Sequence, residues 1–227
     1  MWAIRVGFSV NGHDPKYILG KLDRRIDTRR VNKTTPARLV HGGTRAPPRW
    51  RKEVERILIT EQQIARRIHA MSRDIEREFR GRETVVVSLL NGTVMFLADL
   101  IRHLSLPLRL DFIGVSSYGA GTESGELVFT KELRLDVHGR DVLLVDDILD
   151  TGKTLSRVIP KLRALKPRRI KVVVLLDKPE RRVEKVEADY VGFTIPNVFV
   201  VGYGLDYAEK YRNLSFVGVL KPEMYQT

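Results

Sequence analysis

The segment 142–154 combines acidic and hydroxyl side chains with a Gly-Lys-Thr run, between two hydrophobic stretches. Its first four residues are apolar β-formers and predict a buried strand. The helix expected next carries four apolar residues on one face: Leu155, Val158, Ile159 and Leu162. This order of strand, loop and helix points backbone N–H groups and a positive helix end at one place, which suits a phosphate. Asp146 and Asp147, just before the loop, suit sugar hydroxyls or a metal ion. One loop therefore offers both halves of a site for a phosphorylated sugar.

A nucleotide-binding P-loop is the obvious alternative for this segment. That motif reads Gly-x-x-x-x-Gly-Lys-[Ser/Thr], and Gly152, Lys153 and Thr154 supply its end. Asp147 stands where the first glycine is required, and a carboxylate at that position would repel a triphosphate. The segment therefore does not predict a P-loop.

The segment instead resembles the ribose-phosphate signature of the type I phosphoribosyltransferases. Four further motifs fall in the order and spacing of the hypoxanthine (hypoxanthine-guanine) phosphoribosyltransferases of that family: residues 89–92, 116–119, 175–178 and 199–207. The resemblance extends from about Val54 to Tyr225. It implies the type I α/β fold, a central and mostly parallel sheet flanked by helices, with a small hood and a mobile lid loop.

The resemblance also implies a reaction, that of a purine salvage transferase. Such an enzyme moves the 5-phosphoribosyl group of phosphoribosyl pyrophosphate to N9 of hypoxanthine, and of guanine, giving IMP or GMP and pyrophosphate. Positive charge builds on the sugar as its bond to pyrophosphate breaks. Catalysis must therefore stabilise that charge, neutralise the pyrophosphate and take a proton from the purine. The implied cofactor is Mg²⁺, which takes oxygen ligands from one or two carboxylates and from the substrate's own phosphates.

Within this implied reaction, the segment 142–154 would hold and activate the sugar phosphate. By resemblance, Asp150 is the general base that meets N7 of the purine, and Asp146 and Asp147 hold the ribose hydroxyls. The 5′-phosphate would be cradled by Thr151, Gly152, Lys153 and Thr154. A purely structural alternative, an acidic cap before a helix, needs one Asp rather than three.

The remaining motifs would bind the purine and the pyrophosphate. By resemblance, Lys178 donates to the 6-oxo group, which favours 6-oxopurines over adenine because an amino group cannot accept that bond. Phe199 would stack on the base, and the Val200 backbone would bond its edge. Asp206, together with Asp146, would hold Mg²⁺, and Arg212 would meet pyrophosphate. Without the resemblance, such residues are more often plain core or surface residues.

The sequence departs from the family pattern at Asn91, which precedes Gly92 in the implied pyrophosphate loop. Many relatives have Lys or another cation there, and the loop often carries a strained, cis peptide. If backbone amides do most of the binding, Asn is tolerated, whereas a required cation would make the contact weaker here. We favour the first interpretation.

The wider sequence predicts alternating strands and helices that could position these residues. Thr60 and Gln63 form a capping box before a helix that Gly81 ends. Further helices are expected at 93–104 and 153–165, and strands at 85–90, 108–115, 142–146, 170–176, 190–194 and 198–201. This alternation predicts a parallel sheet with helices on both faces, and ligands at the carboxyl ends of its strands.

The Gly- and Ser-rich segment 117–127, which contains Ser117 and Tyr118, is predicted to be a lid. By resemblance, this loop closes over the reacting sugar. A long surface hairpin is the structural alternative.

The charge of the chain is concentrated at its N-terminal end. Of its net charge of +12, residues 1–52 contribute 13 Lys and Arg against three Asp, whereas residues 53–227 are nearly neutral. We expect a mostly disordered leader over 1–52 and the phosphoribosyltransferase domain over 53–227. A start codon assigned too far upstream, or a dispensable tail, is the favoured explanation of the leader. An organellar transit segment and a nucleic-acid-binding arm are the alternatives, and the first is disfavoured by a lone serine, Ser9.

Composition indicates where the protein is located and which kinds of site it can form. The chain has no Cys, which excludes disulfides and thiolate metal sites and fits a cytoplasmic location. No stretch approaches the roughly 18 apolar residues that span a membrane.

We expect a homodimer or homotetramer, with no nucleic acid partner. The alternatives are a regulator that binds nucleic acid through the same fold, and an enzyme for xanthine or a pyrimidine. The joint presence of Asp150, Lys178 and Asp206 favours an enzyme over a regulator.

Overall fold

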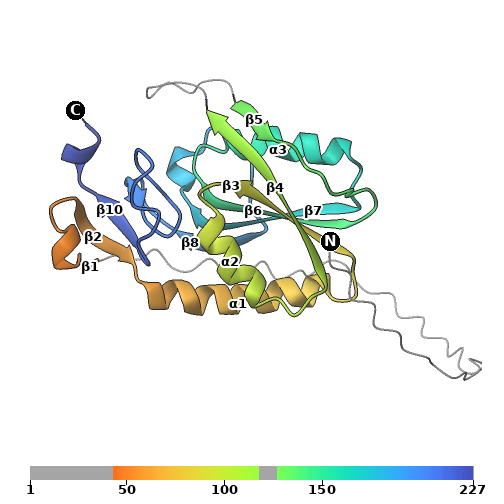
Figure 1. The fold of residues 1–227 in the computed structure, drawn as a ribbon, viewed down its shortest axis with the longest axis horizontal. Coiled ribbons are helices and arrows are strands. Elements are labelled where there is room, and N and C mark those ends of the chain that lie inside the picture. Colours follow the sequence, from red (N-terminus) through yellow and green to blue (C-terminus); the bar gives the residue numbers. More distant parts are fainter. Residues whose placement is uncertain (1–42, 118–126, 227) are drawn as a thin grey trace, which may run out of the picture. The chain divides into compact units, whose positions relative to one another are not determined.

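The structure, a computed structural model, describes residues 43–117 and 127–226. Its larger sheet has six strands in the order β5-β4-β3-β6-β7-β8 (Figure 1). All neighbours in it are parallel except β4 and β5, which pair antiparallel. The strands are β3 (Thr84–Leu90), β4 (Leu108–Ser117), β5 (Leu127–Lys131), β6 (Asp141–Leu149), β7 (Arg169–Asp177) and β8 (Tyr190–Thr194). The predicted mostly parallel central sheet is confirmed.

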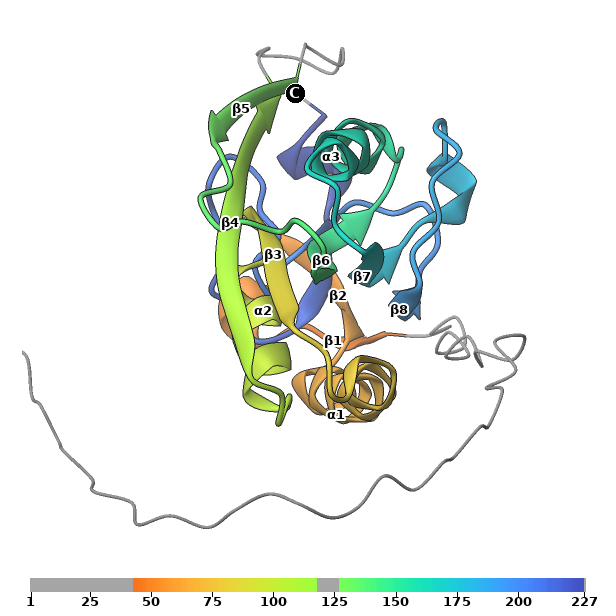
Figure 2. The same cartoon turned by 90° about the vertical axis from the view of Figure 1, so that its right-hand side faces the viewer.

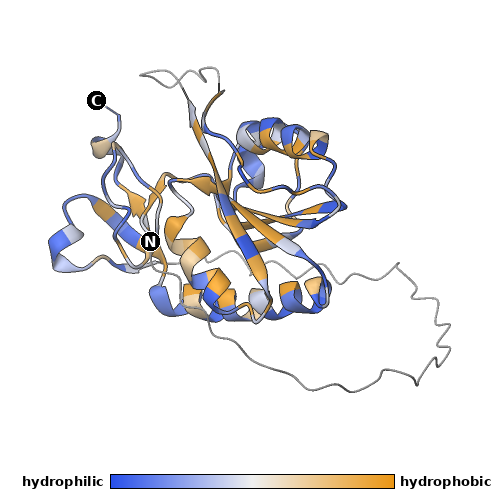
Figure 3. Cartoon of the chain, turned by 45° about the vertical axis from the view of Figure 1, so that its right-hand side comes forward, coloured by the Kyte–Doolittle hydropathy of each residue, from blue (hydrophilic) through white to orange (hydrophobic). Residues whose placement is uncertain are grey.

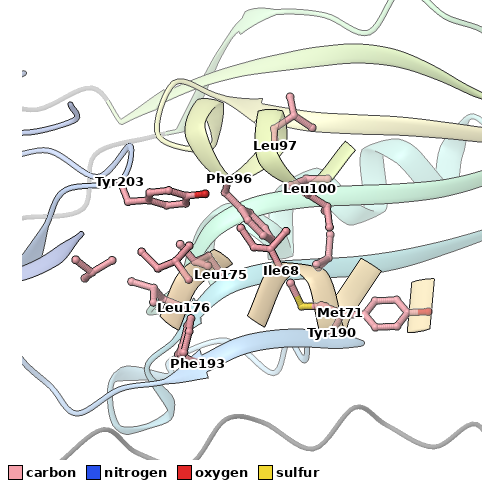
Figure 4. Close-up of a cluster of buried hydrophobic side chains, with 14 of the residues drawn as sticks. Ile68, Met71, Phe96, Leu97, Leu100, Leu175, Leu176, Tyr190, Phe193 and Tyr203 are labelled. Atoms are coloured by element: carbon pink, nitrogen blue, oxygen red, sulfur yellow. The ribbon is translucent and has the colours of Figure 1, made fainter. Parts of the chain in front are cut away.

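Helices cover both faces of this sheet, as the alternation of strands and helices predicts (Figure 2). Along β6, Leu143 and Val145 belong to a core shared with α1 (Glu61–Phe79) and α2 (Val94–Arg102). Val142 and Leu144, one residue out of phase, belong to the core shared with α3 (Lys153–Ala164). Successive side chains of a strand point to opposite faces, so a continuously apolar strand is buried on both sides. Figure 4 shows part of the first core, where aromatic and aliphatic side chains of α1, α2 and β7 meet.

The helix α1 begins and ends where the sequence indicates. The Thr60 Oγ1 atom accepts a hydrogen bond from the Gln63 amide at 3.3 Å, and the Gln63 side chain accepts one from the Thr60 amide at 2.8 Å. Gly81, with φ of +69°, follows its C-terminal end. Its buried residues form one stripe, and Figure 3 shows the matching alternation of hydrophilic and hydrophobic segments along the helix. The capping box prediction is confirmed.

A second, four-stranded antiparallel sheet forms the hood, in the order β1-β2-β10-β9. Its strands are β1 (Thr44–Arg45), β2 (Val54–Ile59), β10 (Val217–Leu220) and β9 (Val200–Val201). Of these four strands, only β9 was predicted from the sequence. The sheet has its own core, with Val54, Val201, Leu214 and Leu220 buried in it. Single-turn helices η1 (Pro48–Trp50), η2 (Pro179–Arg181) and η3 (Pro222–Met224) complete the described elements.

The hood also moves the beginning of the domain ahead of the boundary expected at Glu53. Ala46 is only 1% exposed, and the Trp50 ring packs edge-on against Tyr211 with centroids 5.9 Å apart. Residues 44–50 therefore belong to the folded domain and correct the expected disorder of this stretch. The hydrophobic periodicity of residues 44–50 did not predict their burial, because the residues they pack against lie far along the chain. Residues 1–42 lie outside the described residues, as do residues 118–126 with Tyr118 of the predicted lid. The strand β4 ends at Ser117.

Candidate active site

A cavity of about 300 Å³ opens at the carboxyl ends of the parallel strands, where an α/β sheet usually binds its ligand. Segments far apart in sequence line it: the end of β3, the loop between β6 and α3, and the segment after β9. Ten residues expected to bind or react contribute to this lining: Asn91, Gly92, Asp146, Asp147, Asp150, Thr151, Gly152, Thr154, Asp206 and Arg212. The motifs of the sequence are thus gathered at one place. Lys153, Lys178, Phe199 and Val200 do not contribute to the lining.

The loop from β6 to α3 makes a sharp turn at Gly152. This residue has φ of +84°, a left-handed conformation that L side chains rarely adopt. Lys153 then begins α3, so the amides of the first helical turn lie next to the cavity. The Lys153 amide is 3.4 Å from the Thr151 hydroxyl, which accepts from it. A helix N-terminus beside a cavity that also contains Thr151 and Thr154 is suited to a phosphate group.

Asp146, which is buried, and Asp147, which is half-buried, form an acidic pair near the end of β6. Asp146 is only 6% exposed, and its Oδ1 accepts a hydrogen bond from the Asp147 amide at 3.0 Å. Burial raises the pKa of both carboxyl groups, and the neighbouring charge of Asp147 raises the pKa of Asp146 further. A ligand that brings hydroxyl donors or a cation would therefore stabilise the ionised pair.

Two glycines allow three loops to meet beside this pair. A Cβ atom on Gly92 would lie 1.8 Å from the Asp147 Oδ2 atom, and one on Gly204 would lie 2.0 Å from the Gly92 carbonyl oxygen. Gly204 also has φ of +100°. The peptide bond between Leu90 and Asn91 is cis. A side chain at Gly204 would displace the backbone of the loop after β3, and a side chain at Gly92 would displace the Asp147 carboxylate.

Asp206 and Arg212 lie on the hood side of the cavity. Arg212 Nη1 is 2.9 Å from Asp206 Oδ1 and also donates to the Gly204 carbonyl at 2.9 Å. The other carboxylate oxygen of Asp206 accepts from the Glu209 amide at 2.9 Å. These contacts orient one carboxylate and one guanidinium toward the same space.

Asp150 and Lys178 form a second charged pair. The Lys178 Nζ atom lies 4.0 Å from Asp150 Oδ2, and Lys178 is 4% exposed. Burial lowers the pKa of Lys178, the nearby Asp150 opposes this shift, and Arg181 adds to it. The other Asp150 oxygen, Oδ1, is buried and accepts no hydrogen bond from the described residues, although Arg181 Nε is 3.4 Å away. Asp150 is therefore held by two cations, Lys178 at one carboxylate oxygen and Arg181 at the other.

This arrangement is matched by known proteins. The family described as the phosphoribosyl transferase domain matches residues 55–208. A hypoxanthine-guanine phosphoribosyltransferase of Bacillus subtilis is 44% identical over 176 residues, which are 77% of this chain and 98% of that protein. The chain belongs to the hypoxanthine-guanine phosphoribosyltransferase family. The bifunctional protein TilS/HprT of Listeria monocytogenes is 47% identical over 174 residues, 76% of this chain, but the chain spans only 27% of the length of that relative.

Solved structures of the family share the fold. A crystal structure of a hypoxanthine phosphoribosyltransferase from Staphylococcus aureus has a TM-score of 0.74 at 43% identity. The match covers 78% of this chain and 97% of that one. A hypoxanthine-guanine phosphoribosyltransferase from Bacillus anthracis gives a TM-score of 0.70 at 41% identity, over 74% of this chain and 99% of that one. The type I phosphoribosyltransferase fold expected from the motifs is confirmed.

In this member of the family, Phe199 already has aromatic neighbours. Its ring stacks on Tyr225 with centroids 4.6 Å apart and planes 21° apart, and it meets Tyr207 edge-on at 5.7 Å. The stacking on Tyr225 was not predicted, because only the fold brings the C-terminal segment to the hood. The contacts that Arg181 and Arg182 make with the loop after β6 were not predicted either, since surface arginines are common.

Proposed function

We propose that this protein transfers the 5-phosphoribosyl group of phosphoribosyl pyrophosphate to N9 of hypoxanthine, and of guanine, releasing pyrophosphate with IMP or GMP. The observation that carries the proposal is the convergence on one cavity of a helix N-terminus, the acidic pair and Asp150, whose carboxylate lies 4.0 Å from the Lys178 ammonium group. A phosphate, a ribose and a purine would each find a matching partner there. The name of the Bacillus subtilis relative, of which the chain covers 98%, agrees with this activity.

In the proposed mechanism, each loop supports one part of the substrate. The amides at the start of α3 and the hydroxyls of Thr151 and Thr154 bind the 5′-phosphate. Asp146 and Asp147 accept hydrogen bonds from the ribose hydroxyls, and their negative charge stabilises the positive charge that develops on the sugar. As N9 forms the bond to C1 and the bond to pyrophosphate breaks, Asp150 accepts the proton from N7 of the purine.

In the proposed mechanism, Lys178 determines which purine base is accepted. As a buried ammonium group it donates to the 6-oxo group of hypoxanthine or guanine. Adenine offers an amino group there, so Lys178 would face a second donor and lose the bond. Phe199, whose ring also contacts Tyr225 and Tyr207, stacks on the base, and the Val200 backbone bonds the purine edge.

The residues at the cavity fit Mg²⁺ held largely by its substrate. In the part of the chain that the structure describes, no three His, Cys, Asp or Glu side chains gather into a metal cage. Asp206 lies at the cavity, and the pKa of Asp146 is raised by burial, so each carboxylate would gain from a nearby cation. When bound, Mg²⁺ neutralises the charge of the leaving pyrophosphate, which Asn91, Gly92 and Arg212 also contact in this proposal. A lid containing Ser117 and Tyr118 would complete the site.

No helix among the described residues has the length and apolar character needed to cross a membrane. A cytoplasmic location and a homodimer or homotetramer remain part of the proposal. In one solved relative, the hypoxanthine phosphoribosyl transferase of Trypanosoma cruzi, the C-terminal region has a role in the oligomeric state and enzymatic activity.

The proposal is tested by incubating the protein with phosphoribosyl pyrophosphate, Mg²⁺ and one of five bases: hypoxanthine, guanine, xanthine, adenine or uracil. We expect IMP and GMP as the main products, identified by chromatography. Asp150→Asn should retain phosphoribosyl pyrophosphate binding and lose roughly 10²-fold in kcat, the scale of a positioned acid or base. A kcat near that of the unmodified enzyme would reject Asp150 as the base, and a main product from adenine or uracil would reject the substrate class.

A further inference from the structure

The loop between β6 and α3 has a second side, which faces away from the cavity toward the segment 178–184. There three consecutive carbonyl oxygens of the loop accept hydrogen bonds. That of Leu149 accepts from the Lys178 amide at 3.0 Å, and that of Thr151 accepts from the amides of residues 183 and 184 at 2.9 and 3.0 Å. The Asp150 carbonyl accepts from Arg182 Nε at 2.9 Å. Residues 178–184 thus donate hydrogen bonds to the backbone carbonyls of residues 149–151. We call residues 149–152 the phosphate loop.

Arg182 adds its side chain to this network of backbone hydrogen bonds. Its Nη2 atom donates to the Leu149 carbonyl at 3.0 Å and pairs with the carboxylate of Asp177, and its Nη1 atom donates to the Val186 carbonyl at 2.6 Å. All three guanidinium nitrogens are therefore occupied. The side chain is 19% exposed, and a Cβ atom on Gly152 would lie 3.1 Å from Arg182 Cδ. The Arg182 side chain is packed directly against the turn.

The direction of these carbonyls decides whether the loop can bind an anion. A carbonyl oxygen that faced a phosphate would repel it, whereas an amide N–H attracts it. When the carbonyls are held from outside by a cation with fixed geometry, the peptide planes turn their amides toward the cavity. This preorganisation would otherwise have to be established at each binding event.

We propose that Arg182 is a positioning residue that orients the phosphate loop for the 5′-phosphate of the substrate. It touches neither substrate nor reacting atoms and acts through the backbone of residues 149–152. The inference rests on the proposed function, because it assigns the loop to a phosphorylated sugar.

The test compares Arg182→Ala and Arg182→Lys with a matched control, Arg157→Ala, on the exposed side of α3. Dissociation constants for ribose 5-phosphate and, separately, for pyrophosphate with Mg²⁺ are measured by calorimetry, alongside Tm. We expect ribose 5-phosphate affinity to fall roughly 10- to 100-fold in both Arg182 variants, the usual effect of losing a group that orients a ligand-binding element. Pyrophosphate affinity should change less than about threefold, and low millimolar guanidinium ions should restore part of the loss in Arg182→Ala.

Equal losses for the two ligands, with no rescue by guanidinium, would overturn the inference and make Arg182 a general stabiliser of the fold. If the alanine variant fails to fold, the lysine variant keeps the positive charge and decides the question through the same two ligands. Turnover of hypoxanthine by the unmodified enzyme is measured in parallel. Loss of ribose 5-phosphate binding in the variants without any IMP formation by the unmodified enzyme would reject the proposed function and leave the positioning role intact.

Discussion

Burial gives Lys178 an acid–base behaviour unlike that of a surface lysine. The side chain is 5% exposed and lies beside Asp150, yet desolvation outweighs this carboxylate and lowers the pKa of Lys178. A group with a lowered pKa loses its proton at a lower pH than an ordinary lysine, whose pKa is about 10.4. In the proposed mechanism, deprotonation removes the strong donor to the 6-oxo group. At alkaline pH, the use of the purine should therefore weaken more than the use of phosphoribosyl pyrophosphate.

This reasoning predicts the pH profile of Lys178→Ala. We expect kcat/KM for hypoxanthine to fall roughly 10- to 100-fold near pH 7, the range for a lost hydrogen bond to a charged group, with KM for phosphoribosyl pyrophosphate little changed. The ratio of the unmodified enzyme to the variant should shrink as the pH rises, because the unmodified enzyme loses its charged donor there. Taking the ratio at each pH cancels the ionisation of the base itself. A ratio constant with pH, or equal losses for the two substrates, would assign Lys178 a structural role.

At the scale of elements, the site depends on loops that approach one another more closely than side chains allow. Gly204, after β9, meets the backbone of Gly92, after β3, and Gly92 in turn meets the side chain of Asp147 near the end of β6. Tyr203, beside Gly204, adds a tether, because its buried hydroxyl donates to Asp99 on α2. The hood and the central sheet are thus joined next to the cavity itself.

Gly92→Ala tests this close approach. The new methyl group would overlap Asp147 Oδ2 and force the pyrophosphate loop or the acidic pair to move. A misplacement of about 1 Å can cost roughly 10²-fold in rate, so kcat/KM for phosphoribosyl pyrophosphate should fall by about that factor. Gly139→Ala is the control, since Gly139 has positive φ but nothing lies within 4 Å of its added Cβ. It should lose some stability, measured as Tm, and keep its activity. Similar kinetics in the two variants would show that the contact at Gly92 is dispensable.

Elements with local signals were predictable, and those with remote partners were not. The strand β6, the turn at Gly152 and α3 follow from apolar runs and a glycine that lie close together in the sequence. The strands β2 and β10 stabilise each other across most of the chain, as in the pairing of Ile59 with Val217. No periodicity in either segment reveals that partner. The hood as a whole was therefore anticipated by resemblance, and only β9 was predicted from the sequence pattern.

The same division holds within the candidate site. Asp150 and Arg212, which the resemblance to the family implied as site residues, line the cavity. Arg182 was not located, because its acceptors are mostly backbone carbonyls, which every residue possesses. Tyr225 was missed for a related reason, since its stacking on Phe199 depends on how the hood closes. Chemistry carried by residue types can be read from a sequence, but support supplied through the backbone cannot.

At the scale of the whole molecule, the stretch of residues 44–51, ahead of β2, contributes to stability. Trp50 packs against Tyr211, and the Arg49 guanidinium lies 5.1 Å from the centre of the Trp50 ring. Arg51 Nε donates to the carbonyl oxygen of the buried Ala46 at 2.9 Å. These contacts close one side of the hood core.

Two deletions separate the roles of this region. Removing residues 1–42 should leave Tm and kcat unchanged, whereas removing residues 1–52 should lower stability by roughly 2–4 kcal/mol, as expected when large buried side chains are lost. For a domain of this size that corresponds to a fall in Tm of roughly 5–10 °C, measured by thermal unfolding. The assay of hypoxanthine turnover below Tm serves as a control for the site. An equal Tm for the two deletions would mean that Ala46 and Trp50 contribute no stability.

The pairing of β2 with β10 also determines how the domain can be combined with other proteins. These strands are antiparallel neighbours, and Val54 at the start of one lies opposite Leu220 at the end of the other. The strand β1 precedes β2, runs antiparallel to it and pairs Thr44 with Ile57, so the polypeptide enters the hood toward the other end of the sheet from Leu220. A domain whose two ends lie apart in this way can be attached to a partner through either end. The Listeria relatives, in which the matching region is 27% of a bifunctional protein, are an example of such a fusion.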